Sequence, residues 1–473
     1  MQIMLFFLSL VCYPAILLFH FFLFISGRIP FREMCEKCGF LRKIPQKNVR
    51  NHIWIHVSSV GEYRNITGFT DKLKKKYGLP VFLTYFNKDA AFHAETNFDI
   101  AHNQFMPFEF FPAYIRLIKK MKIKAIIVME TEIWPVLLAS AAFCNVPVFL
   151  ISACITDRAF LQYLRFIPFF RRIMKWYHSI FTQSSIDLDK FSMLGANPGK
   201  LYVAGNLKYD LILPAVPDVR AVKRKFHIDE DSWIFTAGSV HEQEDRMVIE
   251  ELEKVFAKIQ NICAVIAPRN LSSLPGFLSF LHRHQIYFVR RSQVPHQNIL
   301  RYPLVYILDT IGELTDMYAI SNFVFVGGSL IPHGGHNILE PLYYNKKTCT
   351  GPYTANFRDI MQSAKSKVEI INEYTLAESI IRHYNKPGKG DNGRQLITIN
   401  AGVGNRILTD LQIPGAEPLP GYVSVMGKKK TTQPKKYTGS YTREKESVNT
   451  IKKTDKPADK AFDKTTDKAA QEV

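Results

Sequence analysis

The stretch FVGGSLIPHGGHNILEP, residues 325–341, joins a short apolar run to a loop with two Gly-Gly pairs and two histidines. Glycine adopts positive φ angles at little cost and lets a ligand approach the backbone closely. A strand, a glycine loop and a helix in this order offer backbone N–H groups to an anion. A tight turn with a capped helix is the simpler alternative. The grouping of His333, His336, Asn337 and Glu340 in one stretch favours a ligand site.

Apolar runs of strand length alternate with helix-length segments on both sides of this stretch. We expect strands at 53–57, 81–85, 125–129, 146–151 and 179–183, and then at 233–239, 263–268, 305–309, 323–329 and 347–351. Such alternation predicts two doubly wound α/β domains with parallel sheets. A proline-containing segment separates the two series. The expected units are an N-terminal segment 1–27, a first domain 28–210, a linker 211–220 and a second domain 221–426.

The N-terminal segment has no charged residue up to Gly27 and is long enough to cross a bilayer as a helix. It lacks the basic start and the cleavage site of a secretory signal. Several basic residues follow it, which places the following chain on the cytoplasmic side: Arg28, Arg32, Lys37, Arg42 and Lys43. We therefore expect an uncleaved membrane anchor. Pro14 and His20 leave open a helix that lies in the membrane interface instead.

The formal net charge of +19 is compatible with nucleic acid, an anionic membrane or a phosphorylated substrate. Residues 427–473 are rich in Lys, Thr and Asp and poor in apolar side chains, so we expect this tail to be disordered. The seven cysteines are an odd number and most lie in apolar runs, as in a reducing compartment. The Cys35–Cys38 pair lacks further metal ligands at suitable spacing, and we expect neither a metal site nor a cofactor.

Acidic and basic residues follow the expected strands of the first domain at the ends where doubly wound sheets bind ligands. Glu62 follows the first strand and is either a helix cap or a general base. Glu130 and Glu132 directly follow the third expected strand, where buried acids usually have a partner or a function. Asn206 and Lys208 lie near the end of the domain. Lys208 is either a site residue or a solvated loop lysine.

The strand ends of the second domain also carry polar residues. Ser239 and His241 follow its first strand, Arg269 follows the next one, and Glu313 follows another. Arg269 is either a ligand for an anion or the partner of a nearby acid. The joint pattern favours two Rossmann-like domains that face each other across a cleft, with a nucleotide-sugar donor in one half and an acceptor in the other. The sequence has neither a GxGxxG fingerprint after the first strand nor a Walker A motif.

The segments SSVGE, METEIWP, GNLKYD, GSVHEQED and FVGGSLIPHGGHNILEP occur in this order along the chain. Together they closely resemble the Kdo transferases of lipopolysaccharide assembly, which are glycosyltransferases of the GT-B type. The resemblance covers roughly residues 1 to 420. It implies transfer of one or more 3-deoxy-D-manno-octulosonic acid (Kdo) residues from CMP-Kdo to the lipid A precursor, lipid IVA. It also implies an inner-membrane enzyme whose catalytic domains face the cytoplasm.

The resemblance also implies roles for matching positions. Glu62 matches the catalytic base, and Glu130 and Lys208 match residues that support the transition state. The positions that match CMP-binding segments are Pro268, Arg269, Ile311, Gly312, Glu313, Asn337, Ile338, Leu339 and Glu340. Further donor-site candidates are Ser239, His241, Gly335 and His336. Direct displacement with one base implies inversion at the anomeric carbon, and the family works without a metal.

Three features depart from the family pattern: the segment TYFNKDAAFH after the second strand, Val240 within GSVHEQED, and the Lys-rich tail. The first departure bears on how the acceptor is handled, and the number of Kdo units and their linkages stay open. Basic residues mixed with aromatic ones at 72–78, 116–124 and 163–181 suit a phosphorylated, acylated acceptor at a membrane surface, or are solvated helix faces.

Two other classes of protein compete with the Kdo transferase. One is another membrane-bound GT-B transferase that uses a UDP-sugar, and the other is a non-catalytic membrane protein that binds nucleic acid. We expect no nucleic-acid partner, because the basic residues are spread through both domains and no RNA- or DNA-binding motif occurs.

Overall fold

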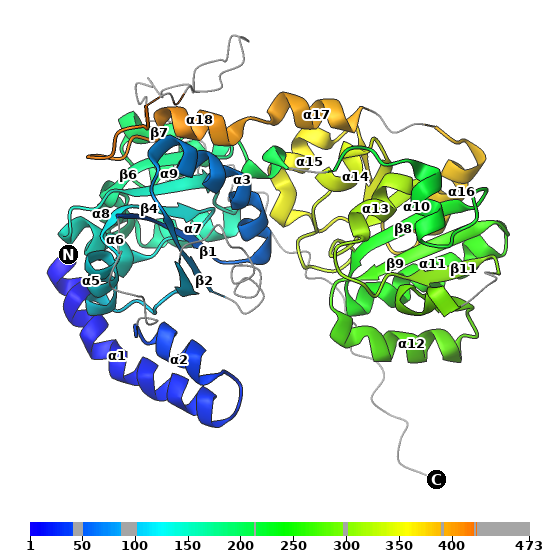
Figure 1. Ribbon diagram of the computed structural model, residues 1–473, viewed down its shortest axis with the longest axis horizontal. Helices are drawn as coiled ribbons and strands as arrows, with labels where there is room; N and C mark the ends of the chain where they lie inside the picture. The colour runs from blue at the N-terminus through cyan, green and yellow to red at the C-terminus, as the bar shows by residue number, and fades with distance from the viewer. Residues whose placement is uncertain are drawn as a thin grey trace, which may run out of the picture. The chain divides into compact units, whose positions relative to one another are not determined.

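The structure is a computed structural model that describes residues 1–40, 51–86, 102–211, 214–296, 301–388, 392–420 and 422 (Figure 1). Two seven-stranded sheets, all of whose pairings are parallel, form the two halves of the chain. The predicted fold class of two Rossmann-like α/β units is confirmed. Residues 87–93 of the departing segment TYFNKDAAFH and the tail at 427–473 lie outside the described residues.

The first sheet has the strand order β3-β2-β1-β4-β5-β6-β7. Its strands are β1 (His52–Val57), β2 (Val81–Tyr85), β3 (His102–Phe105), β4 (Ile123–Met129), β5 (Val148–Ala153), β6 (Tyr177–Thr182) and β7 (Leu201–Val203). The strands at the centre are buried on both faces, which is why they read as continuous apolar runs. The edge strands β3 and β7 were not predicted because β3 is short and largely polar and β7 has only three residues.

Helices cover both faces of the first sheet. One face packs against α1 (Gln2–Ile25), α5 (Phe111–Lys120), α6 (Pro135–Phe143), α7 (Asp157–Arg165), α8 (Ile167–Ile173) and α9 (Ser185–Met193). The opposite face packs against α3 (Val60–Tyr77) and α18 (Val403–Asp410). The short helix α2 (Phe31–Lys37) follows α1. Ser59 caps the start of α3, and Gly78 ends it in the left-handed conformation with φ +64°.

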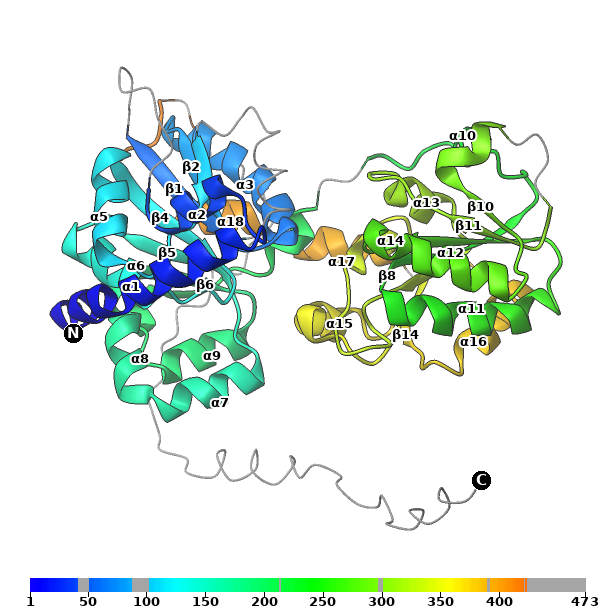
Figure 2. The ribbon, with the colours of Figure 1, turned by 90° about the horizontal axis from the view of Figure 1, so that it is seen from below.

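The second sheet has the strand order β10-β11-β9-β8-β12-β13-β14. Its strands are β8 (Trp233–Val240), β9 (Ile262–Pro268), β10 (Phe288–Arg290), β11 (Leu304–Ile307), β12 (Phe323–Val326), β13 (Lys347–Thr350) and β14 (Val368–Ile370). The three-residue strands β10 and β14 were again not predicted. As Figure 2 shows, α11 (Glu242–Phe256) and α12 (Leu274–Arg283) lie side by side, and they share one face of the sheet with α16 (Leu376–Asn385).

The other face of the second sheet packs against four helices. These are α10 (Val219–Lys225), α13 (Leu314–Ile320), α14 (Leu339–Tyr343) and α15 (Arg358–Ala364). Helix α17 (Gly393–Asn400) packs against α14 through Ile397. Helix α10 begins at Val219, within the predicted linker 211–220.

The end of the described chain returns to the first half, which corrects the predicted domain range 221–426. Val403, Ile407 and Leu411 are buried in the same apolar cluster as β1 and β4. The carboxylate of Asp210 fixes this return, since it accepts hydrogen bonds from the N–H groups of Gly402 at 2.6 Å and Gly404 at 2.8 Å. The prediction failed because the amphipathic pattern of 403–411 does not specify which sheet it covers.

Helix α1 lies along α5 and α6 on the outside of the first half (Figure 1). Leu5 is buried there, and the ring of Tyr13 stacks on Phe110 with centroids 3.6 Å apart. Ser9 and His20 are also buried, whereas many apolar side chains of the helix are exposed, as at Val11 and Leu18. Among the described residues, α1 is the one helix long and apolar enough to cross a membrane.

Candidate active site

The first group of site residues lies where β1 and β4 end side by side. The strand order reverses between β1 and β4 in the first sheet and between β8 and β12 in the second, and ligands of doubly wound folds bind at this point. His56 of β1 pairs with Val128 of β4, so the residues that follow the two strands start at the same edge. The sheet thereby brings Glu62 and Glu130 together, as the sequence predicted.

Glu62 is buried and surrounded by serine hydrogen-bond donors. Its carboxylate accepts hydrogen bonds from the Ser58 N–H at 2.8 Å, the Ser58 hydroxyl at 2.5 Å and the Ser59 hydroxyl at 3.2 Å. Burial and the charge of Glu130 raise the pKa of Glu62 to about 7, and the hydrogen bonds from Ser58 act in the opposite direction. A carboxyl with this pKa is suited to proton transfer near neutral pH.

The alternative role of Glu62 as a helix cap is only partly supported. The N-cap of α3 is Ser59, whose hydroxyl accepts a hydrogen bond from the N–H of Glu62 at 3.2 Å. Glu62 reaches back to the N–H of Ser58, as the glutamate of a capping box does. Its carboxylate therefore has a local structural contact and is also adjacent to other acids. Glu132 is a further acid at this edge, and burial raises its pKa as well.

Glu130 forms an ion pair with Lys208, whose Nζ lies 3.4 Å from the Glu130 carboxylate. Glu130 has a left-handed backbone conformation with φ +54°, which turns the chain sharply at the end of β4. Lys208 also donates a hydrogen bond to the carbonyl of Asn356 at 3.2 Å and lies over the ring of Phe357 at 4.7 Å. The interpretation of Lys208 as a solvated loop residue is therefore wrong.

The N–H groups at the start of the glycine loop of the second half are not free, contrary to the sequence-based expectation. The N–H groups of Gly328, Ser329 and Leu330 donate to the carboxylate of Glu244 at 2.6, 2.7 and 2.8 Å. The helix after the loop is also short, since α14 begins only at Leu339. An anionic ligand at this loop must therefore be bound by other groups.

Three histidines stack beside this loop. The ring of His241 lies 4.3 Å from that of His333 and 5.1 Å from that of His336, and the Nε2 atoms of His241 and His336 are 2.8 Å apart. Burial and the nearby positive charge of Arg269 lower the pKa of His336 to about 3, and burial also lowers that of His241. Both rings of the 2.8 Å pair are thus neutral at pH 7, and one donates to the other.

Arg269 follows β9 at the same edge and is exposed. The alternative that it pairs with a nearby acid is not supported, because within the described ranges Arg269 forms no ion pair. Its backbone N–H donates to the carbonyl of Val240 at 2.8 Å, which holds it beside the end of β8. The guanidinium is available to an anionic ligand. Pro268 and Ser239 flank this position, and Ser239 has a positive φ of 58°.

The NILE segment, residues 337–340, turns at the start of α14. Asn337 donates to the Glu340 carboxylate at 3.4 Å and accepts from the Leu339 N–H at 3.0 Å. Ile338 and Leu339 are buried in the core below. Burial raises the pKa of Glu340, and the charge of Arg64 opposes that shift. Gly335 has φ +78°, and an added Cβ would lie 3.2 Å from the Tyr353 carbonyl oxygen.

In the IGE segment, residues 311–313, the Glu313 carboxylate is already hydrogen-bonded within the protein, whereas the backbone at Ile311 and Gly312 is exposed. Burial acts to raise the pKa of Glu313, but hydrogen bonds from Arg291, Thr310 and Lys225 lower it to about 2. Arg291 contacts the carboxylate through two nitrogens at 3.0 and 3.2 Å. Ile311 is 80% exposed, and Gly312 has φ +91°. Glu313 therefore fixes the segment, while Ile311 and Gly312 are open to a ligand.

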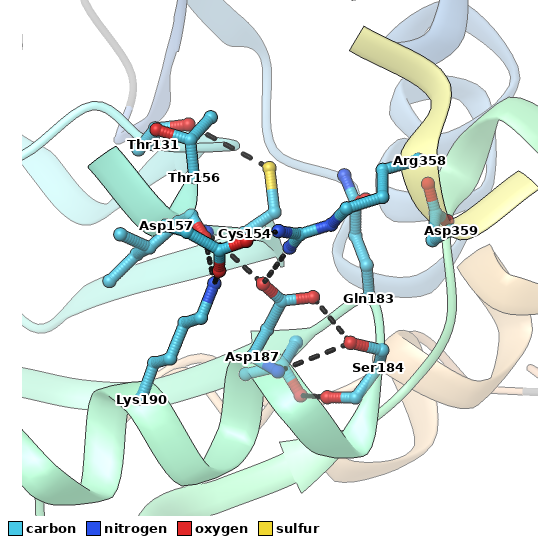
Figure 3. A network of polar contacts seen from close by, with 12 residues as sticks. Thr131, Cys154, Thr156, Asp157, Gln183, Ser184, Asp187, Lys190, Arg358 and Asp359 are labelled. Carbon is cyan, nitrogen blue, oxygen red and sulfur yellow. Dashed lines mark hydrogen bonds and ion pairs between the residues drawn. The ribbon is translucent and has the colours of Figure 1, made fainter. Parts of the chain in front are cut away.

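A polar network outside the predicted residues joins the two halves (Figure 3). Arg358 of α15 lies 2.8 Å from the carboxylate of Asp157 and 3.9 Å from that of Asp187. Lys190 contacts the other oxygen of Asp157 at 2.5 Å. Asp157 and Arg358 are largely exposed, so this pair contributes little stability. Asn206, two residues before Lys208, donates a hydrogen bond to the carboxylate of Asp359 in α15 at 3.0 Å.

The sequence of the chain is similar to that of proteins with a known activity. The family model described as 3-deoxy-D-manno-octulosonic-acid transferase (kdotransferase) matches residues 32–211. A 3-deoxy-D-manno-octulosonic acid transferase from Haemophilus influenzae is 28% identical over 87% of this chain and 97% of its own length. The chain is therefore similar to the Kdo transferases over most of its length. The protein is a transferase of the glycosyltransferase class.

Two solved structures resemble the transferase. The C-terminal CMP-Kdo binding domain of WaaA from Acinetobacter baumannii is 26% identical and covers 41% of this chain and 97% of its own, with a TM-score of 0.34. A glycosyltransferase from Rickettsia africae is 12% identical, with a TM-score of 0.52 over 76% of this chain and 97% of its own. The second likeness shows the fold alone, and it is the fold of the two sheets described above.

Sequence reasoning missed Glu244 and Asn356 of the transferase. Glu244 lies in the quoted GSVHEQED segment, three residues after His241, which is the spacing of a capping box. That spacing was a usable signal. Asn356 donates to the carbonyl of His333 at 3.0 Å and accepts from Lys208, so it connects the glycine loop to the Glu130–Lys208 pair. No local pattern indicates that role.

Proposed function

We propose that this transferase moves Kdo from CMP-Kdo to lipid IVA with inversion at the anomeric carbon. The observation that carries the proposal is the buried Glu62 carboxyl, with a pKa of about 7, at the same strand edge as the Glu130–Lys208 ion pair. An acceptor hydroxyl that attacks a sugar carbon must lose a proton, and Glu62 is placed and tuned to take it. With one base and direct displacement, the new bond forms on the face opposite to the leaving group.

The departing group is the phosphate of CMP, which gains negative charge as the glycosidic bond breaks. Arg269 is an exposed cation at the donor edge that forms no ion pair with any described residue, and Lys208 is a second cation at the acceptor edge. Fixed cations and dipoles that face developing charge are a large source of rate enhancement. The neutral His241–His336 pair adds hydrogen-bonding groups without a net charge. These side chains perform the proposed steps without a metal.

Arg269→Ala tests the donor site. The change removes a charge-assisted contact to phosphate, worth roughly 1.5–3 kcal/mol, so CMP affinity should fall about 10- to 100-fold. Isothermal titration with CMP and with UDP measures this on both proteins, with Arg283→Ala on α12 as the exposed-arginine control. CMP should bind the unchanged chain more tightly than UDP. Tighter binding of UDP would favour a UDP-sugar transferase, and equal CMP affinity in Arg269→Ala would contradict the donor-site assignment.

The acceptor is a membrane lipid, and we propose that α1 holds the transferase at the cytoplasmic face of the inner membrane. Val11 and Leu18 are 76% and 70% exposed, on the side of α1 that does not pack against α5 and α6. A row of exposed apolar side chains on an uncharged helix is costly in water and favourable in a bilayer. The basic residues that follow α1 support the cytoplasmic orientation.

The double variant Val11→Lys, Leu18→Lys tests the anchor without removing the packed residues of α1. We expect most of the protein to move from the salt-washed membrane pellet to the supernatant, because two charges on the exposed face oppose insertion. Ile399→Lys on α17, where the side chain is 72% exposed, is the matched control and should stay in the pellet. Retention of the double variant in the pellet would contradict the role of α1.

A further inference from the structure

Glu244 connects the two segments of the donor half that carry the paired histidines. It is the third residue of α11 and is fully buried. One carboxylate oxygen accepts hydrogen bonds from the N–H groups of Ser329 and Leu330 at 2.7 and 2.8 Å. The other oxygen accepts from Gly328 at 2.6 Å and from the N–H of His241 at 3.2 Å. Four backbone donors thus converge on a single side chain.

Successive backbone N–H groups that point into one concavity form an anion-binding nest. In this chain the anion is the carboxylate of Glu244, so the protein itself holds the loop in this shape. Hydrogen bonds to a charged acceptor are stronger than those between neutral groups, and a buried carboxylate requires them. Removing this acceptor leaves four buried donors without a partner.

The shape of the loop determines where His336 lies. The N–H of Gly335 donates to the carbonyl of Gly328 at 2.7 Å, and the N–H of His336 donates to that of Gly327 at 3.2 Å. A Cβ on Gly328 would lie 2.8 Å from the His336 ring, so backbone and ring are in close contact. The same carboxylate holds the N–H of His241, whose ring is hydrogen-bonded to His336. The relative position of the two rings therefore depends on Glu244.

We propose that Glu244 is a positioning residue for the CMP-binding groups of the transferase. It contacts no substrate itself and acts through the loop 327–336 and His241. The inference rests on the proposed function, because the affected ligand is CMP. Glutamine cannot replace this glutamate, since its amide has one acceptor oxygen and presents N–H donors to backbone N–H groups.

The variant Glu244→Gln tests the proposal, and Glu251→Gln is its matched control. Glu251 is buried on the same helix and accepts a hydrogen bond from the N–H of Ala377 at 2.9 Å, away from the loop. We expect Glu244→Gln to raise the Kd for CMP and the KM for CMP-Kdo by roughly 10- to 100-fold, with kcat changed much less, because binding groups are misplaced. In Glu251→Gln the melting temperature should fall and the Kd for CMP should stay unchanged.

Two further measurements keep the proposal falsifiable. Amide hydrogen exchange across residues 327–336 should accelerate in Glu244→Gln and not in Glu251→Gln, and this readout needs no CMP. Glu244→Asp keeps the carboxylate and should give an intermediate Kd if the glutamine variant does not fold. The positioning role of Glu244 would be contradicted if the unchanged chain, Glu244→Asp and Glu244→Gln bind CMP with equal affinity. It would also be contradicted if Glu244→Gln and Glu251→Gln lose the same amount of CMP affinity. Failure of the unchanged chain to bind CMP contradicts the proposed function instead.

Discussion

Glu62→Gln should lower the rate of Kdo transfer by roughly 10²–10⁴-fold, the usual contribution of a general base. Glutamine keeps the shape of the side chain, and its single amide oxygen still accepts from either the Ser58 N–H or the Ser58 hydroxyl, but it takes no proton. The Kd for CMP should barely change, because the groups assigned to the nucleotide follow strands of the other sheet. Asp71→Asn on the exposed side of α3 removes the same charge elsewhere on the helix and should leave the rate unchanged.

The pH dependence of activity and of stability distinguishes a role of Glu62 as general base from a role as helix cap. In the unchanged transferase, kcat/KM should rise with pH through about 7, since Glu62 must be deprotonated to act. Its folded pKa lies above the ordinary 4.5, so the folded state holds the proton more tightly and loses stability as pH rises from 4.5 to 7. Glu62→Gln removes that loss, so its melting temperature relative to the unchanged chain should be higher at pH 8 than at pH 5. An active Glu62→Gln enzyme would leave Glu62 as a structural residue.

Lys208→Met should lower kcat by roughly 10²–10³-fold, as the loss of one group that stabilises transition-state charge does. Methionine has a similar length and volume, so it can still cover the ring of Phe357, but it lacks the ammonium that contacts Glu130 and the Asn356 carbonyl. Single-turnover measurement of Kdo transfer at saturating CMP-Kdo isolates this effect from binding. The KM for CMP-Kdo should change much less than kcat.

Two variants serve as controls for Lys208→Met. Lys208→Arg keeps a cation at the same place and should recover part of the rate, although its planar head does not reproduce the ammonium geometry. Lys258→Met changes an exposed lysine of the second half and should have no effect. If Lys208→Met transfers Kdo at the unchanged rate, the Glu130–Lys208 pair is a structural contact and has no catalytic role.

The central strands of both sheets were predictable because their apolar sequences match their burial between two layers of helices. Strands such as β2 and β4 are apolar on both faces, as parallel strands buried between two helix layers must be. Edge strands have only one neighbour and fewer buried residues, which explains why β3, β7, β10 and β14 gave no usable signal. The return of 403–411 to the first sheet depends on tertiary contacts such as those of Asp210, which no local pattern reveals.

The site was predictable to the extent that strand order brings its residues together. Glu62 and Glu130 follow adjacent strands, so a doubly wound sheet necessarily places them at one edge. The pairing of Lys208 with Glu130 needs a contact across 78 positions of sequence and was not predicted, because the family resemblance implied only a shared role for the two residues. The prediction that the N–H groups of the glycine loop are free for a ligand was wrong for Gly328 and Ser329. The order of strand, glycine loop and helix indicates that N–H groups converge there, but it does not show that they donate to the carboxylate of Glu244.

The most direct test of the proposed activity is mass spectrometry of the acceptor after incubation with the purified, detergent-solubilised transferase. With lipid IVA and CMP-Kdo, the acceptor should gain the mass of one or more Kdo residues, and the Glu62→Gln enzyme should form little of this product. The same acceptor with UDP-sugars should stay unchanged. Lipid IVA that keeps its original mass with CMP-Kdo, or that gains a sugar from a UDP donor, would contradict the proposed function.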